Sequence, residues 1–182
     1  MTAASFYTQS IRACHQGDAV ARILAAAMQA VDPGNSVQRY IQRIGNALQI
    51  GEQSYRLDNF RQIRILGIGK AAEGMAVALS ALLAGFSYQG LLVPKHAPSQ
   101  NLPGFVALPG GHPVPDEQSL IAGERALQLV SDLSEDDLLI CLVSGGGSAL
   151  MAAPLPGITL ADMQALTSLM LQCGARIDEI NT

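Results

Sequence analysis

Two lysines and a glycine-rich stretch are the residues best suited to chemistry in this sequence. Arginine supplies all but two of the 11 basic residues, and the exceptions, Lys70 and Lys95, each follow an expected strand. The stretch Ser144-Gly145-Gly146-Gly147-Ser148 follows another expected strand. Glycines leave backbone N–H groups clear of side chains, and a helical turn that begins near Ser148 directs those groups at an anion. The pattern therefore indicates a site for phosphate or carboxylate.

Glycine patterns of this kind also have other interpretations. The stretch after residue 143 fits a plain flexible connector between a strand and a helix, and it is not a Walker A motif, because no Gly-Lys-Ser/Thr ends it. A second pattern, Gly67-x-Gly69-x-x-Ala72, matches a variant of the dinucleotide fingerprint. The next expected strand ends in Pro94-Lys95-His96, so the carboxylate that usually holds a NAD ribose is missing. Gly67 and Gly69 remain candidates for binding phosphate or substrate.

The segment from Pro109 to Glu117 contains two further candidate ligands, His112 and Asp116. The simpler alternative makes Asp116 the N-cap of the helix that follows. Asp116 serves both purposes only if it also faces the ligand. His112, between a glycine and a proline, is more often a loop anchor than an acid or base. The sequence leaves both alternatives open.

Strands and helices alternate along the chain in the way that positions such loops. The apolar runs predict strands at 61–66, 90–94, 105–108 and 138–143, and the last run is expected to be buried on both faces. One helix is expected after Ala72 and up to residue 83, and a second from Asp116 to about residue 133. A third is expected from 160 to 173, after a capping box formed by Thr159 and Asp162. The alternation predicts an α/β fold with a parallel Rossmann-like sheet and flanking helices. Ligands bind beyond the carboxyl ends of such strands, so Lys70, Lys95 and the glycine-rich stretch are expected to face one crevice.

The N-terminal third has a different pattern. Apolar residues at helical spacing predict helices over 5–31 and 36–48, separated by Asp32-Pro-Gly34. Residues 1–50 are therefore expected to form a helical segment that packs on the α/β domain.

The composition disfavours several classes of protein. A length of 182 residues with 49% hydrophobic residues suits one domain with a sizeable core. A net charge of −4 gives no attraction for nucleic acid. No apolar stretch is long enough for a membrane span, and the N-terminus lacks the pattern of a signal peptide. Three scattered cysteines without zinc spacing suit a reducing cytoplasm.

Three motifs occur in order: Gly67-Ile-Gly-Lys-Ala-Ala72, Gly111-His-Pro-Val-Pro-Asp116 and Val143-Ser-Gly-Gly-Gly-Ser-Ala-Leu150. Together with Gly157-Ile-Thr-Leu160 and the terminal Ile180-Asn-Thr182, they resemble the N-terminal region of the glycerate 2-kinases that carry a C-terminal MOFRL domain. Each motif alone is unspecific, but the ordered set is specific.

The resemblance implies two α/β domains around a cleft, in which ATP and Mg²⁺ phosphorylate glycerate at its 2-hydroxyl. It implies that Lys70 stabilises the transferred phosphoryl group and that the loop from Ser144 to Ser148 holds the nucleotide phosphates or the glycerate carboxylate. It does not identify the metal ligands. Such proteins are longer, so residues 1–182 are expected to be a truncated N-terminal domain that is inactive alone and forms a homo-oligomer. The alternatives are an NAD(P)H-dependent hydroxypyruvate reductase and a non-catalytic fragment that binds anions.

Overall fold

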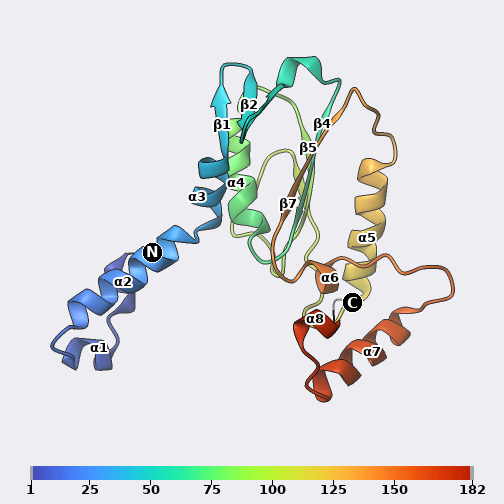
Figure 1. The fold of residues 1–182 in the computed structure, drawn as a ribbon. Coiled ribbons are helices and arrows are strands. Elements are labelled where there is room, and N and C mark those ends of the chain that lie inside the picture. The colour runs from blue at the N-terminus through green and yellow to red at the C-terminus, as the bar shows by residue number, and fades with distance from the viewer. Residues whose placement is uncertain (1, 181–182) are drawn as a thin grey trace.

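The computed structural model describes residues 2–180 of the chain (Figure 1). In chain order its elements are η1 (Ala3–Phe6), α1 (Gln9–Ala13), α2 (Gly17–Ala30), α3 (Pro33–Tyr40), β1 (Ile41–Ile44), β2 (Ala47–Ile50), β3 (Gln53–Arg56), η2 (Leu57–Asn59), β4 (Ile63–Ile68), α4 (Ala72–Leu82), β5 (Gln89–Val93), β6 (Phe105–Ala107), α5 (Glu117–Val130), β7 (Leu138–Val143), α6 (Gly147–Leu150), α7 (Leu160–Gln172) and α8 (Ile177–Ile180).

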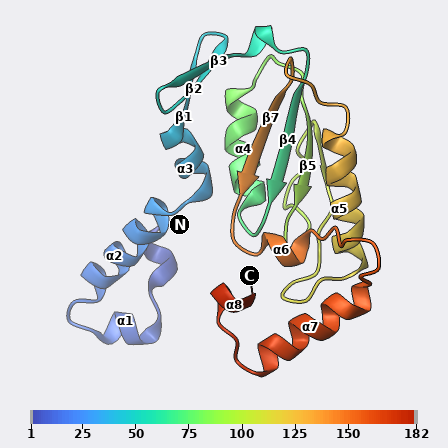
Figure 2. The same cartoon turned by 45° about the vertical axis from the view of Figure 1, so that its right-hand side comes forward.

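Four parallel strands form the central sheet, in the order β6-β5-β4-β7. Helix α4 covers one face and α5 the other, as the turned view in Figure 2 shows. All four strands and the helices between them lie close to their predicted positions. The predicted α/β fold with a parallel sheet and flanking helices is therefore confirmed.

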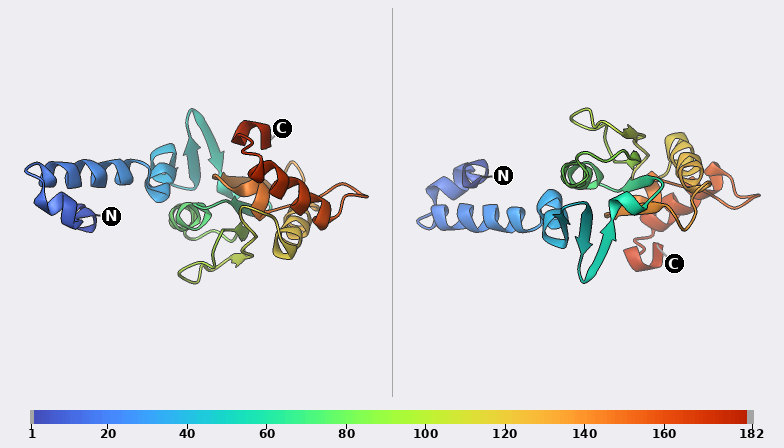
Figure 3. Two further views of the ribbon diagram at one scale, coloured as in Figure 1. Left: turned by 90° about the horizontal axis from the view of Figure 1, so that it is seen from below. Right: turned by 90° about the horizontal axis from the view of Figure 1, so that it is seen from above.

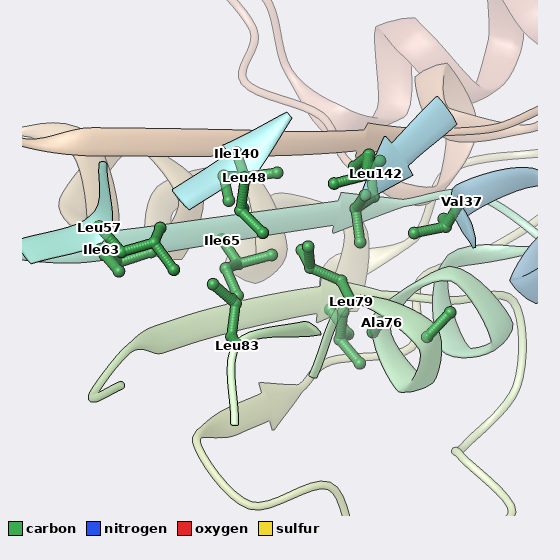
Figure 4. Packing of buried hydrophobic residues seen from close by; sticks show 13 residues of the cluster. Val37, Leu48, Leu57, Ile63, Ile65, Ala76, Leu79, Leu83, Ile140 and Leu142 are labelled. Carbon is green, nitrogen blue, oxygen red and sulfur yellow. The ribbon is translucent and has the colours of Figure 1, made fainter. Parts of the chain in front are cut away.

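The core lies on both sides of β4, because α4 and α5 each contribute an apolar face. On the α4 side, Figure 4 shows side chains from the sheet, α3, α4, β2 and η2 in one cluster. On the α5 side a smaller cluster contains Leu66, Leu91, Val93, Ala122, Ala126 and Leu150. Leu150 belongs to α6, so this second cluster also fixes the short helix that follows the glycine-rich loop.

The expectation that the strand at 138–143 is buried on both faces is wrong. Ile140 and Leu142 are buried, but Leu139, Cys141 and Val143 are exposed, Val143 by 68%. Strand β7 is at the edge of the sheet, and α5 packs over β4 and β5 instead of β7. A short apolar run shows that a strand is apolar on both faces, but not whether a helix covers both of them.

The N-terminal segment is only partly helical, which corrects the expectation for residues 1–50. Helix α3 ends at Tyr40, and β1, β2 and β3 form an antiparallel sheet over residues that were expected to continue the helix. The strands turn at Gly45 and Gly51, both with φ of +59°. Helix α3 packs on α4, and β1 and β2 contribute Ile41 and Leu48 to the same core cluster, whereas α1 and α2 project from the rest of the chain as an arm (Figure 3).

None of the helices in residues 2–180 is long and apolar enough to span a membrane.

Candidate anion and phosphoryl-transfer site

The loop after β4 and the loop after β7 are joined by hydrogen bonds at the carboxyl edge of the sheet. The Lys70 N–H donates to the Gly145 carbonyl (3.1 Å). The Ser144 hydroxyl accepts from the Ala71 N–H (3.0 Å) and donates to the Ile68 carbonyl (3.1 Å). Ser144 therefore fixes one loop against the other, and its contact with a ligand stays a prediction.

The two glycines of the first loop have different roles. Gly69 has φ of +104°, and a Cβ there would lie 2.3 Å from the Ser144 carbonyl oxygen, so only glycine allows the two loops to come this close. Gly67 is buried within β4, where a Cβ would lie 2.5 Å from the Leu92 side chain. Gly67 thus serves strand packing, and its contact with phosphate or substrate stays a prediction.

Gly146 lies between the side chains of Lys70 and His112. A Cβ at Gly146 would be 3.1 Å from His112 Nε2 and 3.3 Å from Lys70 Cε. The φ of Gly146 is +95°, a conformation that other residues rarely adopt. The structure therefore brings together three predicted site residues from three separate loops, packed so closely that a side chain at Gly146 would press on the other two.

The charges of both lysines act on His112. Partial burial lowers the pKa of His112, and the positive charges of Lys70 and then Lys95 lower it further. Among residues 2–180, neither lysine forms an ion pair with a carboxylate. Uncompensated positive charge beside a neutral imidazole favours an anionic ligand.

The loop that carries His112 is fixed by Asp116 and Ser119. The Asp116 carboxylate accepts from the N–H groups of Gly111 (3.0 Å) and Ser119 (2.9 Å), and the two residues form a capping box at the start of α5. Burial opposes ionisation of Asp116, but hydrogen bonds from Ser119, Gly111 and Gln118 outweigh it, so its pKa lies below the usual value. The predicted N-cap role is confirmed, and the Oδ1 atom of Asp116 is occupied by hydrogen bonds within the loop.

Ser119 was not predicted as part of this arrangement, although it is fully buried. Its hydroxyl accepts from the Gly111 N–H (3.0 Å), and its carbonyl accepts from the Ala152 N–H (3.0 Å). Its position three residues after Asp116 was the available signal, since that spacing is typical of a capping box.

The glycine-rich loop offers backbone donors at this edge. Helix α6 begins at Gly147, as predicted for a helical turn near Ser148. Among residues 2–180, no backbone carbonyl accepts from the N–H groups of Gly145, Gly146 or Gly147. Gly145 and Ser148 are exposed. These donors, with Lys70 and Lys95, suit the phosphates of a nucleotide.

The described residues offer few side chains that could bind a magnesium ion. Within residues 2–180, no group of three or more His, Cys, Asp or Glu side chains is placed to hold a metal ion. Glu73 accepts hydrogen bonds from the Ser99 N–H (2.7 Å) and hydroxyl (2.6 Å), and Asp116 is bonded to its own loop. Mg²⁺ often relies on substrate phosphates and one or two carboxylates, so the described residues identify no set of ligands for it.

We expect Gly146→Val to weaken ATP binding about tenfold or more, because a hydrogen bond to a charged group contributes roughly 1.5–3 kcal/mol. The valine side chain would press on Lys70 and His112 and disfavour the positive φ. Titration calorimetry with ATP measures the effect. Gly157→Val is the control, since Gly157 also has positive φ (+92°) but open space around it. Equal affinities in both variants would show that the loop is only a connector.

Comparison with known proteins assigns the chain to a family. Residues 19–182 match the family described as "Domain of unknown function (DUF4147)". The chain belongs to this family. The match includes the loops that carry Lys70, Lys95, His112 and Gly146.

The DUF4147 chain also has named relatives. It is 41% identical over 125 residues to the D-glycerate 2-kinase of Thermotoga maritima, covering 68% of this chain and 30% of that protein. It is 38% identical over 117 residues to an Agrobacterium vitis protein provisionally named a hydroxypyruvate reductase, covering 64% and 30%. The solved structure of a Pyrococcus horikoshii OT3 protein matches with a TM-score of 0.76 at 32% identity, covering 88% of this chain and 36% of that one.

The predicted resemblance to the N-terminal region of glycerate 2-kinases is thereby confirmed. The DUF4147 chain spans about a third of the length of the proteins that it matches.

Proposed function

We propose that this chain contributes to the ATP- and Mg²⁺-dependent phosphorylation of glycerate at its 2-hydroxyl. The observation that carries the proposal is the meeting of Lys70, His112 and Gly146, with unpaired positive charge and backbone donors beside them. Phosphoryl transfer depends mainly on positioning and on stabilising charge, and these groups serve both needs. Relatives named as glycerate 2-kinases support the choice of substrate.

Within this proposal, ATP supplies the phosphoryl group and its phosphates bind at Lys70 and the amides of the glycine-rich loop. Lys70 stabilises the negative charge of the transferred group. Because the described residues lack a free carboxylate cluster, we assign no residue of this chain as a ligand of Mg²⁺. Homo-oligomerisation and a cytoplasmic location stay predictions.

The test is direct. The purified chain is incubated with ATP, Mg²⁺ and D-glycerate, and the products are separated and compared with 2-phosphoglycerate and 3-phosphoglycerate standards. Formation of the 2-phosphate, dependent on ATP, supports the proposal. Formation of the 3-phosphate contradicts it.

We expect no specific binding of NADH or NADPH, although one relative bears the name of a reductase. Strand β5 ends at Val93 and is followed by Pro94 and the exposed Lys95 and His96, so no carboxylate is present there for the ribose hydroxyls. Fluorescence titration with NADH, with ATP as competitor, measures this. Saturable micromolar binding of NADH would favour the reductase over the kinase.

A further inference from the structure

Phosphorylation of a hydroxyl group requires that its proton leaves, and a positioned base is the usual acceptor. The carboxylates close to the two joined loops are already bonded: Asp116 to Gly111 and Ser119, and Glu73 to Ser99. The imidazole of His112 is different, because its Cδ2 and Nε2 atoms approach Gly146, where a Cβ would lie 3.0 and 3.1 Å from them. The ring edge that carries Nε2 therefore faces the glycine-rich loop, next to the Lys70 side chain, whose Cε would lie 3.3 Å from the same Cβ.

The loop that carries His112 is held by hydrogen bonds and by close packing of its backbone. Its neighbour Gly111 donates to both Asp116 Oδ1 and Ser119 Oγ, each at 3.0 Å. A Cβ at Gly110 would lie 1.9 Å from the Leu150 carbonyl oxygen, so this loop lies directly against α6. The loop that carries His112 is thus held in a defined place relative to the glycine-rich loop, as the loop of a proton acceptor must be.

The protonation state of His112 suits the same role. Burial, then the charges of Lys70 and Lys95, favour the neutral ring, which has a free lone pair. These two lysines, on the loops after β4 and β5, are the charged groups that act on it. Bound phosphates offset the lysine charges, so the nucleotide that reacts also makes the ring more basic.

We propose that His112 is the catalytic base of this site and receives the proton of the acceptor hydroxyl at Nε2. This inference rests on the proposed function and adds a residue to it. As the hydroxyl oxygen forms its bond to the terminal phosphorus of ATP, the bond from that phosphorus to the ADP oxygen breaks. The hydroxyl proton passes to Nε2, and the resulting imidazolium releases it to solvent after the product leaves.

The kinetic test compares His112→Gln with the unmodified chain across pH 5 to 9. We expect turnover to fall by about 10²–10⁴-fold, the range for loss of a general base, and the acid limb of the pH profile to disappear. His15→Gln, an exposed histidine in the N-terminal arm, is the matched control. A normal rate in His112→Gln, or a slow rate with the acid limb unchanged, would overturn the assignment while the proposed function stands.

An NMR titration decides the proposal even if the chain shows no turnover. The chain has three histidines, and His112→Gln identifies the resonance of His112. We expect ATP to raise the pKa of His112, and D-glycerate added with ATP to shift its Nε2 resonance. If neither ligand changes this resonance, the ring does not touch the substrate and the proposal fails, whatever the outcome of the turnover assay.

Discussion

Replacing Lys70 by alanine in a complete version of the enzyme is expected to reduce glycerate phosphorylation by about 10²–10³-fold, the loss seen when one preorganised donor to a developing negative charge is removed. Lys70 has no carboxylate partner among the described residues, so its charge is free to act on the phosphoryl group. Its backbone is fixed by the bond from its N–H to the Gly145 carbonyl. The loss should therefore come from the side chain alone, with the loop intact.

Steady-state kinetics measures this effect. We expect kcat to fall much more than the KM for glycerate rises, because a contact made mainly in the transition state affects turnover. Arg39→Ala removes one positive charge from an exposed position of α3 and controls for net charge. If Lys70→Ala and Arg39→Ala retain the same kcat, Lys70 has no part in the chemistry.

The sequence was sufficient for the central sheet and for the residues at its edge. Asp116 and Thr159 each begin a helix with a capping box, and these local signals need no tertiary contact. The rule that parallel strands present their carboxyl ends together placed Lys70 beside the glycine-rich loop, where its N–H donates to the Gly145 carbonyl. These predictions succeeded because each depends on local chemistry or on strand direction.

Other features depend on contacts that the pattern does not contain. The helical spacing after Ser36 led to the prediction of a helix over 36–48. The two residues Gly45-Asn46, which form the turn between Ile44 and Ala47, are a hairpin signal that this prediction left unused. The approach of His112 to Gly146 depends on how a proline-rich loop folds onto α6, and spacing along the chain does not encode this. The structural role of the Ser144 hydroxyl has the same origin.

The largest effect on stability is expected from Gly69→Ala. The φ of +104° costs about 1–3 kcal/mol for a residue with a side chain. The added Cβ would also lie 2.3 Å from the Ser144 carbonyl oxygen and 2.4 Å from its hydroxyl oxygen. Ser144 cannot move aside without losing its bonds to Ile68 and Ala71, so overpacking adds about 1–3 kcal/mol.

Urea unfolding followed by circular dichroism measures the loss, and Gly85→Ala separates its two causes. Gly85 has a similar φ of +88°, but no atom lies within 4 Å of a Cβ placed there. We expect Gly85→Ala to show the conformational cost alone and Gly69→Ala to lose clearly more. The Gly69 variant should also bind ATP more weakly, because any separation of the two loops moves Lys70 away from Gly146. Equal losses of stability in the two variants would mean that the contact between Gly69 and Ser144 does not hold the loops together.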